Sequence, residues 1–353
     1  MAKSKSPGKL KKIILSMVAL TVVLGAIAGY DFYKKVYYPN VSLKKGESET
    51  FLYVPTGSDF TDLMQLLQEA HLLQNSSTFD WVAEQMKYKN KVKPGKYLIK
   101  KGMSNRELVT LLRSGVQVPV KVVFNNVRTR NQLAGVISKQ LECDSAALMG
   151  LLGNETYLKE IGFAPETAMA LFIPNTYEFF WNTDARGFMS RMASEYKTFW
   201  NPSRKARASK IGLTQTQVST LASIVEQETR RNSEKALIAG VYMNRYLKGW
   251  KLEADPTLIF AAGDFTIQRV LNIHKEIDSP YNTYLYTGLP PGPICVPSIA
   301  SLDAVLNYET HDYMFFCARE DFSGYHSFAK SYSEHLVNAR RFQNELNRRN
   351  IKS

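Results

Sequence analysis

The sequence predicts an α+β protein with a single N-terminal transmembrane helix, a small α/β module and a larger mixed α+β domain. Residues 13–30 contain no charged side chain, which is typical of a membrane-spanning segment. Short strand-like apolar runs then alternate with segments whose apolar residues recur at helical spacing. A chain of 353 residues with 44% hydrophobic content is long enough for two or three domains with cores of their own.

The composition limits the class of protein. The formal net charge is +13, and five lysines without an acid lie in the first twelve residues, which leaves 13 − 5 = +8 for the remainder. Such an excess of positive charge favours binding to nucleic acid, to anionic lipid or to another anionic polymer. Three cysteines, Cys143, Cys295 and Cys317, are too few for a disulfide scaffold. No metalloprotease, serine-hydrolase or P-loop motif is present, and neither a metal nor a cofactor is expected.

Residues 13–30 are predicted to cross the membrane as one helix, because eighteen residues at helical rise span about 27 Å. Tyr30, Phe32 and Tyr33 follow as an interfacial aromatic belt. Residues 1–12 form a basic tail that the positive-inside rule keeps in the cytoplasm. We therefore expect a single-pass protein of the plasma (inner) membrane with everything after the helix outside.

A cleaved signal peptide is the alternative, since Ala26-Ile27-Ala28 fits a small-x-small cleavage site. The length of the apolar run favours a retained anchor. Recovery of a soluble mature protein that begins at Gly29 would contradict the anchor. Both alternatives export the chain, which argues against nucleic acid as a partner.

Residues 31–47 are polar and are predicted to form a linker. Residues 48–116 are predicted to form the small α/β module. The patterns in that module predict a strand, two helices, a second strand after a turn and a third helix. The predicted elements cover residues 51–54, 59–70, 77–86, 92–99 and 105–114. Their order, with the KPGKYLI and KKGMS pieces, resembles the LysM-like module of exported cell-wall proteins. The alternative is a small α/β domain without a ligand.

Residues 117–353 are predicted to form the larger domain. Its first part should contain a strand, three helices, an extended aromatic stretch with Tyr177 and a fourth helix, at residues 118–124, 128–141, 145–152, 156–161, 172–179 and 184–198. Thr214 and Gln217 make a capping box for the next helix, which ends near Arg231. Further helices are expected at residues 234–248 and about 333–349, and Asp255 is expected in a turn.

Glu226 lies near the end of the helix that Thr214 begins. It directly follows an apolar stripe, and burial beside such a stripe would raise its carboxyl pKa towards the range useful for proton donation. On a solvated face it would instead pair with Arg230 at i+4. Glu228 lies about 200° further round the helix, so we expect it to point away from the site. The stripe consists of Val218, Leu221, Ala222, Ile224 and Val225.

The segment 279–294 is the second candidate for function. Four prolines stiffen it, and it presents Tyr281 and Tyr284 beside the polar side chains of Asn282 and Thr283. Flat aromatic faces next to amide and hydroxyl groups suit sugar rings, which have apolar faces and polar rims. The alternative is a rigid surface loop whose tyrosines pack locally.

Four stretches, FIPNTYEF, LASIVEQET, DPTLIFA and SPYNTYLYTGLPPGPI, occur in this order. Together they resemble the MltG-type, or YceG-like, endolytic murein transglycosylases over nearly the whole chain. The resemblance implies that Glu226 is the catalytic residue. The chain departs from the family pattern at Met169-Ala170, at Asn175 and at Cys295-Val296-Pro297-Ser298. We assign no catalytic role to Asn175 or Cys295.

The resemblance implies a membrane-anchored lytic endotransglycosylase that cleaves the MurNAc–GlcNAc bond within nascent peptidoglycan strands and leaves 1,6-anhydro-MurNAc ends. Attack by the C6 hydroxyl of the same ring is intramolecular, so Glu226 alone can serve as acid and then base. The implied partners are glycan strands, the lipid bilayer and peptidoglycan synthases. The expected substrate-binding residues are Tyr281, Asn282, Thr283, Tyr284, Asp255 and Tyr177.

Two other functions stay open. A muramidase-type hydrolase would use Glu226 as acid and Asp255 as base, because ordinary glycoside hydrolysis needs two carboxylates. A non-catalytic peptidoglycan-binding scaffold would bind glycan without turnover.

Overall fold

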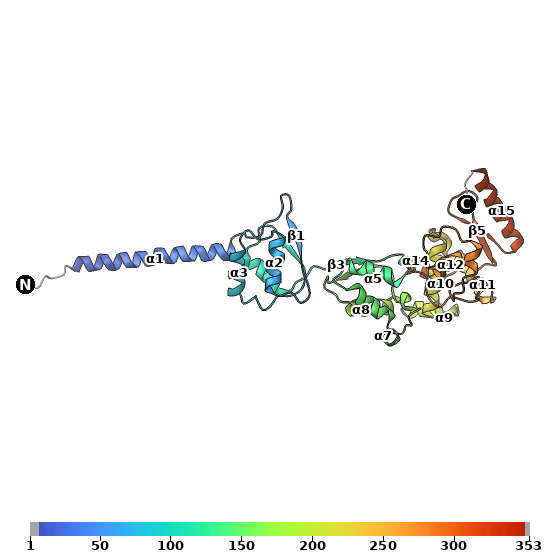
Figure 1. The fold of residues 1–353 in the computed structure, drawn as a ribbon, viewed down its shortest axis with the longest axis horizontal. Helices are drawn as coiled ribbons and strands as arrows, with labels where there is room; N and C mark the ends of the chain where they lie inside the picture. Colours follow the sequence, from blue (N-terminus) through green and yellow to red (C-terminus); the bar gives the residue numbers. More distant parts are fainter. Residues whose placement is uncertain (1–6, 350–353) are drawn as a thin grey trace, which may run out of the picture. The chain divides into compact units, whose positions relative to one another are not determined.

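The computed structural model describes residues 7–349, which fold into two compact units. One unit holds the residues up to Val120 together with 179–182, and the other holds Lys121–Glu178 and the residues from Thr183 onward. Figure 1 labels many of the elements of both units. The mixed α+β class expected from the sequence is confirmed.

The chain begins with helix α1 (Pro7–Tyr37). It is the one helix among the described residues that is long and apolar enough to cross a membrane. The predicted linker at residues 31–47 is wrong in its first part, because α1 continues to Tyr37 and buries Val36 in the core of the first unit. Of the predicted basic tail, residues 1–6 lie outside the described residues and the others belong to α1.

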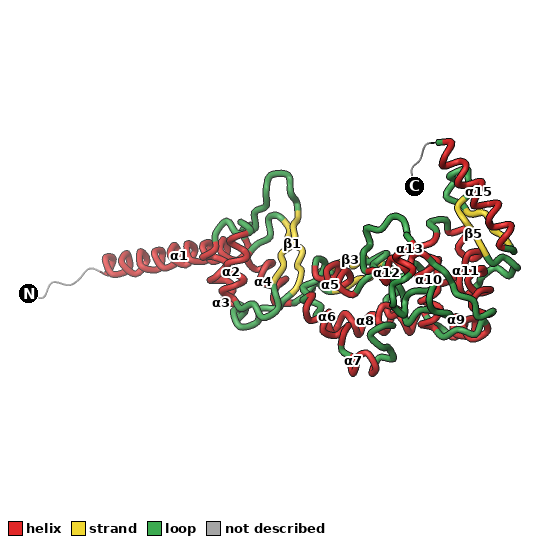
Figure 2. The backbone as a smooth tube through the Cα atoms, turned by 45° about the vertical axis from the view of Figure 1, so that its right-hand side comes forward, coloured by secondary structure: helices red, strands yellow, loops and turns green. Residues whose placement is uncertain are grey.

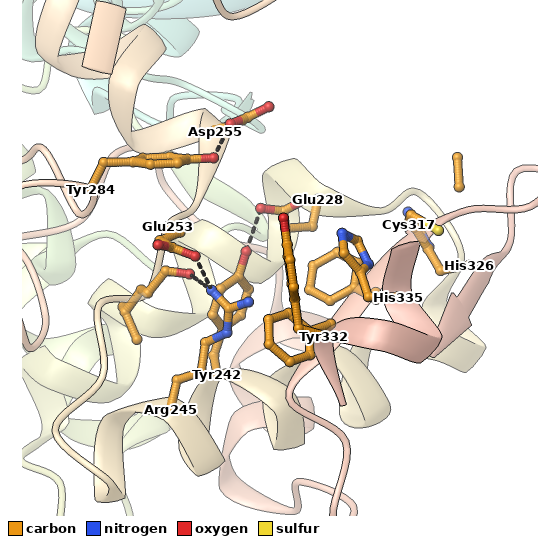
Figure 3. A pocket seen from close by; sticks show the side chains of 14 residues that line it. Glu228, Tyr242, Arg245, Glu253, Asp255, Tyr284, Cys317, His326, Tyr332 and His335 are labelled. Atoms are coloured by element: carbon orange, nitrogen blue, oxygen red, sulfur yellow. Dashed lines mark hydrogen bonds and ion pairs between the residues drawn. The ribbon is translucent and has the colours of Figure 1, made fainter. Parts of the chain in front are cut away.

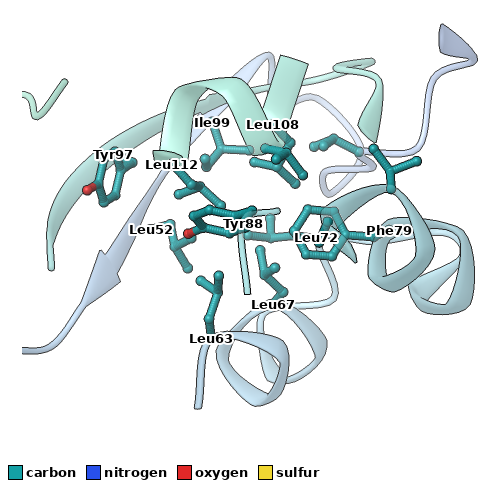
Figure 4. Close-up of a cluster of buried hydrophobic side chains, with 14 of the residues drawn as sticks. Leu52, Leu63, Leu67, Leu72, Phe79, Tyr88, Tyr97, Ile99, Leu108 and Leu112 are labelled. Atoms are coloured by element: carbon teal, nitrogen blue, oxygen red, sulfur yellow. The ribbon is translucent and has the colours of Figure 1, made fainter. Parts of the chain in front are cut away.

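The first unit confirms the predicted order of strand, two helices, strand and helix. Strands β1 and β2 pair antiparallel in a register that joins Glu49 to Lys100 and Val54 to Gly95. Tyr88 and Phe79 lie at the centre of its apolar core (Figure 4). The elements are β1 (Glu49–Val54), α2 (Phe60–Glu69), α3 (Ser76–Gln85), β2 (Gly95–Lys100) and α4 (Asn105–Ser114).

The second unit begins with a small sheet and short helices. Phe124, Phe172, Tyr177 and Phe188 make ring contacts in its core. The elements are β3 (Val120–Val123), α5 (Arg130–Ser138), α6 (Ser145–Gly153), α7 (Glu155–Glu160), the 3-10 helix η1 (Ala168–Leu171), β4 (Thr176–Phe179), α8 (Ala185–Phe199) and α9 (Pro202–Lys210). Strands β3 and β4 form a two-stranded sheet.

Helix α10 (Gln215–Glu228) is the centre of the remaining part of this unit. It packs against α11 (Asn232–Leu247), α12 (Asp255–Ala262) and α14 (Ile299–Leu306). Every residue from Val218 to Val225 is buried. The predicted capping box is present, since Thr214 and Gln217 bond to each other's backbone N–H groups. The partly exposed polar residues of this helix therefore lie in its first and last turns.

The chain ends in a β-hairpin and a helix. Strands β5 (Phe315–Ala318) and β6 (His326–Ala329) pair antiparallel, and α15 (Tyr332–Arg348) packs on both strands (Figure 2). The expectation of a turn at Asp255 is wrong, because Asp255 is the first residue of α12 and Pro256 occupies the first turn, where its missing N–H costs nothing. Helices α9 and α14, the short α13 (Asn272–Lys275) and both strands of the hairpin were not predicted.

Candidate active site

The last turn of α10 carries two glutamates, Glu226 and Glu228, in different surroundings. Two residues along a helix turn the side chain by about 200°, so the two carboxylates face different neighbours. Glu226 faces α14 and the start of α11, while Glu228 faces the end of α11 and the terminal hairpin. The chemistry of the site depends on which of these surroundings suits a proton donor.

The carboxylate of Glu226 is held by the side chains of three residues. Its Oε2 accepts hydrogen bonds from Lys235 Nζ at 2.9 Å and from the hydroxyls of Ser298 and Ser301 at 2.5 Å each. Burial opposes ionisation, but these three bonds outweigh it and lower the pKa of Glu226. The raised pKa expected for Glu226 is therefore wrong, and its cationic partner is Lys235 rather than Arg230. This carboxylate is held in the charged form.

Glu228 has the opposite electrostatics. Burial raises its pKa to about 7, and the negative charge of Asp255 adds to the effect. The Tyr242 hydroxyl donates to Glu228 Oε1 at 2.5 Å and offsets only part of the shift. A carboxyl with a pKa near neutrality is protonated often enough to donate a proton and is able to take one back afterwards.

Glu228 lines a cavity of about 410 Å³ between α10, α11, the start of α12 and the terminal hairpin (Figure 3). Asp255 and Tyr284 line the same cavity, and the Tyr284 hydroxyl donates to Asp255 Oδ1 at 2.6 Å. Glu228 turns away from Glu226, as its position on the helix predicts, but it shares this cavity with two of the predicted substrate-binding residues.

Other side chains shape the cavity. Arg245 is buried and donates to the carbonyls of Met314 and Leu252, which fixes the hairpin to α11 and to the chain before α12. His326 lines the wall and is held by Glu234, which accepts from both its backbone N–H and its ring nitrogen at 2.9 Å. The cavity thus has charged and aromatic walls on a rigid frame, an arrangement that suits a polar ligand with apolar faces.

The predicted sugar-binding loop divides into residues with different roles. Asn282 is fully buried, donates to the carbonyls of Lys275 and Ile277, and accepts from the backbone of Tyr284. Thr283 is buried against Thr257 in α12. These two side chains hold the loop in shape and leave Tyr284 as the residue that reaches the cavity.

Tyr281 and Tyr177 lie elsewhere. Tyr281 lines a separate cavity with Arg128 and Phe260, and burial raises its pKa to about 12. Tyr177 is buried in the core, where its hydroxyl donates to the Ile173 carbonyl. The structure therefore brings Asp255 and Tyr284 together with Glu228 and does not bring Tyr281 or Tyr177 to the same cavity.

Sequence reasoning missed Glu228, Tyr242 and Arg245 as members of one cavity, whereas the family resemblance did imply that the region from His326 to His335 forms a wall of the cleft. Tyr242 and Arg245 lie one turn apart in a helix that was predicted, and this spacing is the one available signal that they share a face. His326 lies in a strand that was not predicted. Among the described residues, no group of three or more His, Cys, Asp or Glu side chains is arranged to hold a metal ion.

Comparisons with known proteins agree on one family. The profile of the YceG-like family matches residues 52–341. The endolytic murein transglycosylase of Bacillus subtilis (strain 168) is 26% identical over 310 residues, which cover 83% of this chain and 84% of that protein. The endolytic murein transglycosylase of Streptococcus pneumoniae (strain D39) is 25% identical over 87% of this chain, which spans 61% of that longer protein.

A solved structure is also similar. The crystal structure of a YceG-like protein from Listeria monocytogenes aligns with a TM-score of 0.56 and 26% sequence identity. The alignment covers 82% of this chain and 98% of the Listeria chain.

Proposed function

Because this chain belongs to the YceG-like family, we propose that it is a peptidoglycan lytic transglycosylase that cuts within glycan strands. The names of the Bacillus and Streptococcus relatives support the reaction class. The observation that carries the proposal for the site is the half-buried Glu228, with a pKa of about 7, in a cavity lined by Asp255 and Tyr284. We assign the general acid/base to Glu228 in place of Glu226, because Glu226 is held as an anion.

The reaction then needs a single titrating carboxyl. Protonated Glu228 donates its proton to the glycosidic oxygen as the bond from that oxygen to C1 of the muramic acid breaks. The C6 hydroxyl of the same ring attacks C1, and the Glu228 carboxylate takes the proton that this hydroxyl loses. The products are a strand with a 1,6-anhydro end and a strand with a free hydroxyl. Glu228 finishes protonated and ready for another cycle.

Two neighbours prepare Glu228 for both halves of the reaction. The Tyr242 hydroxyl bonds to Oε1 and orients the carboxyl. Asp255 is exposed and carries a negative charge near Glu228, which favours its protonated form before cleavage. The same negative charge would stabilise the oxocarbenium-like transition state that glycoside cleavage passes through.

A muramidase-type hydrolase remains the second candidate, because Asp255 lies in the same cavity as Glu228 and could activate a water as base. The mass of the products distinguishes the two reactions. Purified glycan strands digested with the wild-type protein should yield anhydro ends, whereas hydrolysis yields reducing ends that are heavier by one water. Reducing ends that disappear in Asp255→Asn would contradict the transglycosylase.

A non-catalytic scaffold predicts neither product. If wild-type protein binds strands and releases no fragments, while Glu228→Gln binds equally well, the scaffold replaces the enzyme. Undiminished release of anhydro ends by Glu228→Gln, with loss of release in Glu226→Gln, would instead restore Glu226 as the catalytic residue.

We propose further that α1 anchors the protein in the plasma membrane with its N-terminus in the cytoplasm, and that the first unit is a LysM-like module that holds the glycan strand. The apolar α1 and the antiparallel β1–β2 pair flanking two helices support these assignments. Partition of the full chain with membranes, and binding of glycan strands by a fragment that begins at Asp31 and so keeps Val36, test them. A fully soluble chain or a first unit without affinity for glycan would contradict them.

A further inference from the structure

A second cavity, of about 600 Å³, adjoins the one at Glu228. The two cavities share Glu228, Ala318 and His326, so a ligand that occupies the first can extend into the second. We call the second cavity the arginine pocket, because Arg230, Arg231 and Arg319 line it. Figure 3 labels Glu228 and His326, two of the residues that line both cavities.

The charge of the arginine pocket is strongly positive. Glu228 is the one carboxyl among the residues that line it, and the burial of Glu228 favours its neutral form. Within the described part of the chain, none of the three arginines forms an ion pair with a carboxylate. Three arginines around one cavity raise its positive potential, which Asp321 near Arg319 offsets only in part, and an anionic ligand would lower that potential further.

The contacts of the arginines leave donors available. Arg231 donates to the Ser323 carbonyl at 2.6 Å, and Arg319 donates to the His326 carbonyl at 3.0 Å. Both guanidinium groups lie near the ring of Tyr325, which fixes their planes. A guanidinium carries five N–H donors, so one such bond each leaves most donors able to meet a ligand.

We propose that the arginine pocket binds the free carboxylates of the peptide stem on the muramic acid next to the bond that is cut. This inference rests on the proposed function. Muramic acid carries its peptide on a lactyl arm, and that peptide ends in carboxylates. A guanidinium matches a carboxylate with two parallel hydrogen bonds, which a lysine cannot do. Because the two cavities share a wall, the pocket lies next to the cavity in which we propose that the sugar ring binds.

The experiment compares glycan strands that keep their peptide stems with strands whose stems an amidase has removed. Binding to the full-length Glu228→Gln protein and turnover by the wild-type protein are both measured. We expect wild type to prefer intact strands by about tenfold or more in kcat/KM, the effect of one charge-assisted hydrogen bond. Arg230→Gln, alone and with Arg319→Gln, should reduce this preference and leave cleavage of stripped strands unchanged.

Lys210→Gln removes the same charge from an exposed position on α9 and serves as the control, which should keep the full preference. Added salt should weaken binding of intact strands more than binding of stripped strands. Equal binding of both strands, or a preference that survives Arg230→Gln with Arg319→Gln, overturns the proposal. So does displacement of intact strands by inorganic phosphate but not by the free stem peptide. Stem-dependent binding without anhydro products would overturn the proposed reaction and leave the stem site standing.

Discussion

Glu226 and Glu228 lie two residues apart in α10 and differ in almost every property that matters for proton transfer. Glu226 accepts from Lys235, Ser298 and Ser301, and its pKa is lowered. Glu228 accepts from one tyrosine hydroxyl, and its pKa is raised to about 7. The difference comes from neighbours on other elements, since both residues belong to the same helix turn. Glu226 is suited to joining α10, α11 and α14, and Glu228 to moving a proton.

Removing the carboxyl of Glu228 should have the largest effect. Glu228→Gln keeps the shape and the bond from Tyr242, but it cannot donate and then recover a proton. We expect kcat for release of anhydro ends to fall by about 10³-fold, within the range for loss of a general acid/base. Mass spectrometry of digested strands measures the release. A fall of less than tenfold would contradict the role of Glu228.

Changing Glu226 should mainly lower stability. Glu226→Gln leaves the buried Lys235 without a carboxylate, and we expect the free energy of unfolding to fall by about 3 kcal/mol at pH 7. Because the folded pKa of Glu226 lies below its unfolded value, this stabilisation is present above the unfolded pKa and is lost as pH falls through the folded pKa. Urea denaturation of the two proteins at pH 7 and in acid tests the prediction.

The double variant Glu226→Gln with Lys235→Met provides the control for Glu226. Removing both partners eliminates the unpaired charge, so the double variant should be more stable than Glu226→Gln alone. If Glu226→Gln unfolds at the wild-type denaturant concentration and abolishes turnover, then Glu226 is the catalytic carboxylate and does not stabilise the fold.

Tyr242→Phe should have the smallest effect and reports on the tuning of Glu228. The hydroxyl donates to the carboxylate and so favours the charged form, and its loss should raise the pKa of Glu228 further. In wild type, activity should decline as pH rises past about 7, because the acid form is lost. In the variant this decline should move to higher pH, with a plateau lower by about tenfold or less. An unchanged profile would show that Tyr242 does not tune the site.

Much of the fold could be predicted from local signals. Helix boundaries followed from caps such as Thr214 with Gln217, and Gly115 ends α4 in the left-handed conformation as a C-cap. The hairpin β5–β6 could not be predicted, because its strands are short and pack on α15 and, through Phe316, on Tyr242 of α11. The extent of the linker was misjudged because Val36 is apolar within a polar segment and becomes buried only when the first unit packs.

The sequence located the site at the last turn of α10, but it did not identify which glutamate of that turn lines the cavity. The apolar stripe located the end of α10, and the rigid loop located Tyr284 beside it. Burial of Glu226 next to the stripe was correctly inferred, but three donors from α11 and α14 reverse its effect on the pKa. Those donors are nine residues and more than seventy residues away in sequence, and no local pattern reports them.

The central claim is that Glu228 is the group that exchanges a proton near neutral pH while Glu226 stays ionised. The most direct test is a carbon-13 NMR titration of protein labelled at the glutamate carboxyl carbon, with Glu228→Gln and Glu226→Gln used to assign the two resonances. We predict that the Glu228 resonance titrates near pH 7 and that the Glu226 resonance shows no titration between about pH 5 and pH 8. A Glu226 resonance that titrates near neutrality, with Glu228 ionised throughout that range, would contradict the account.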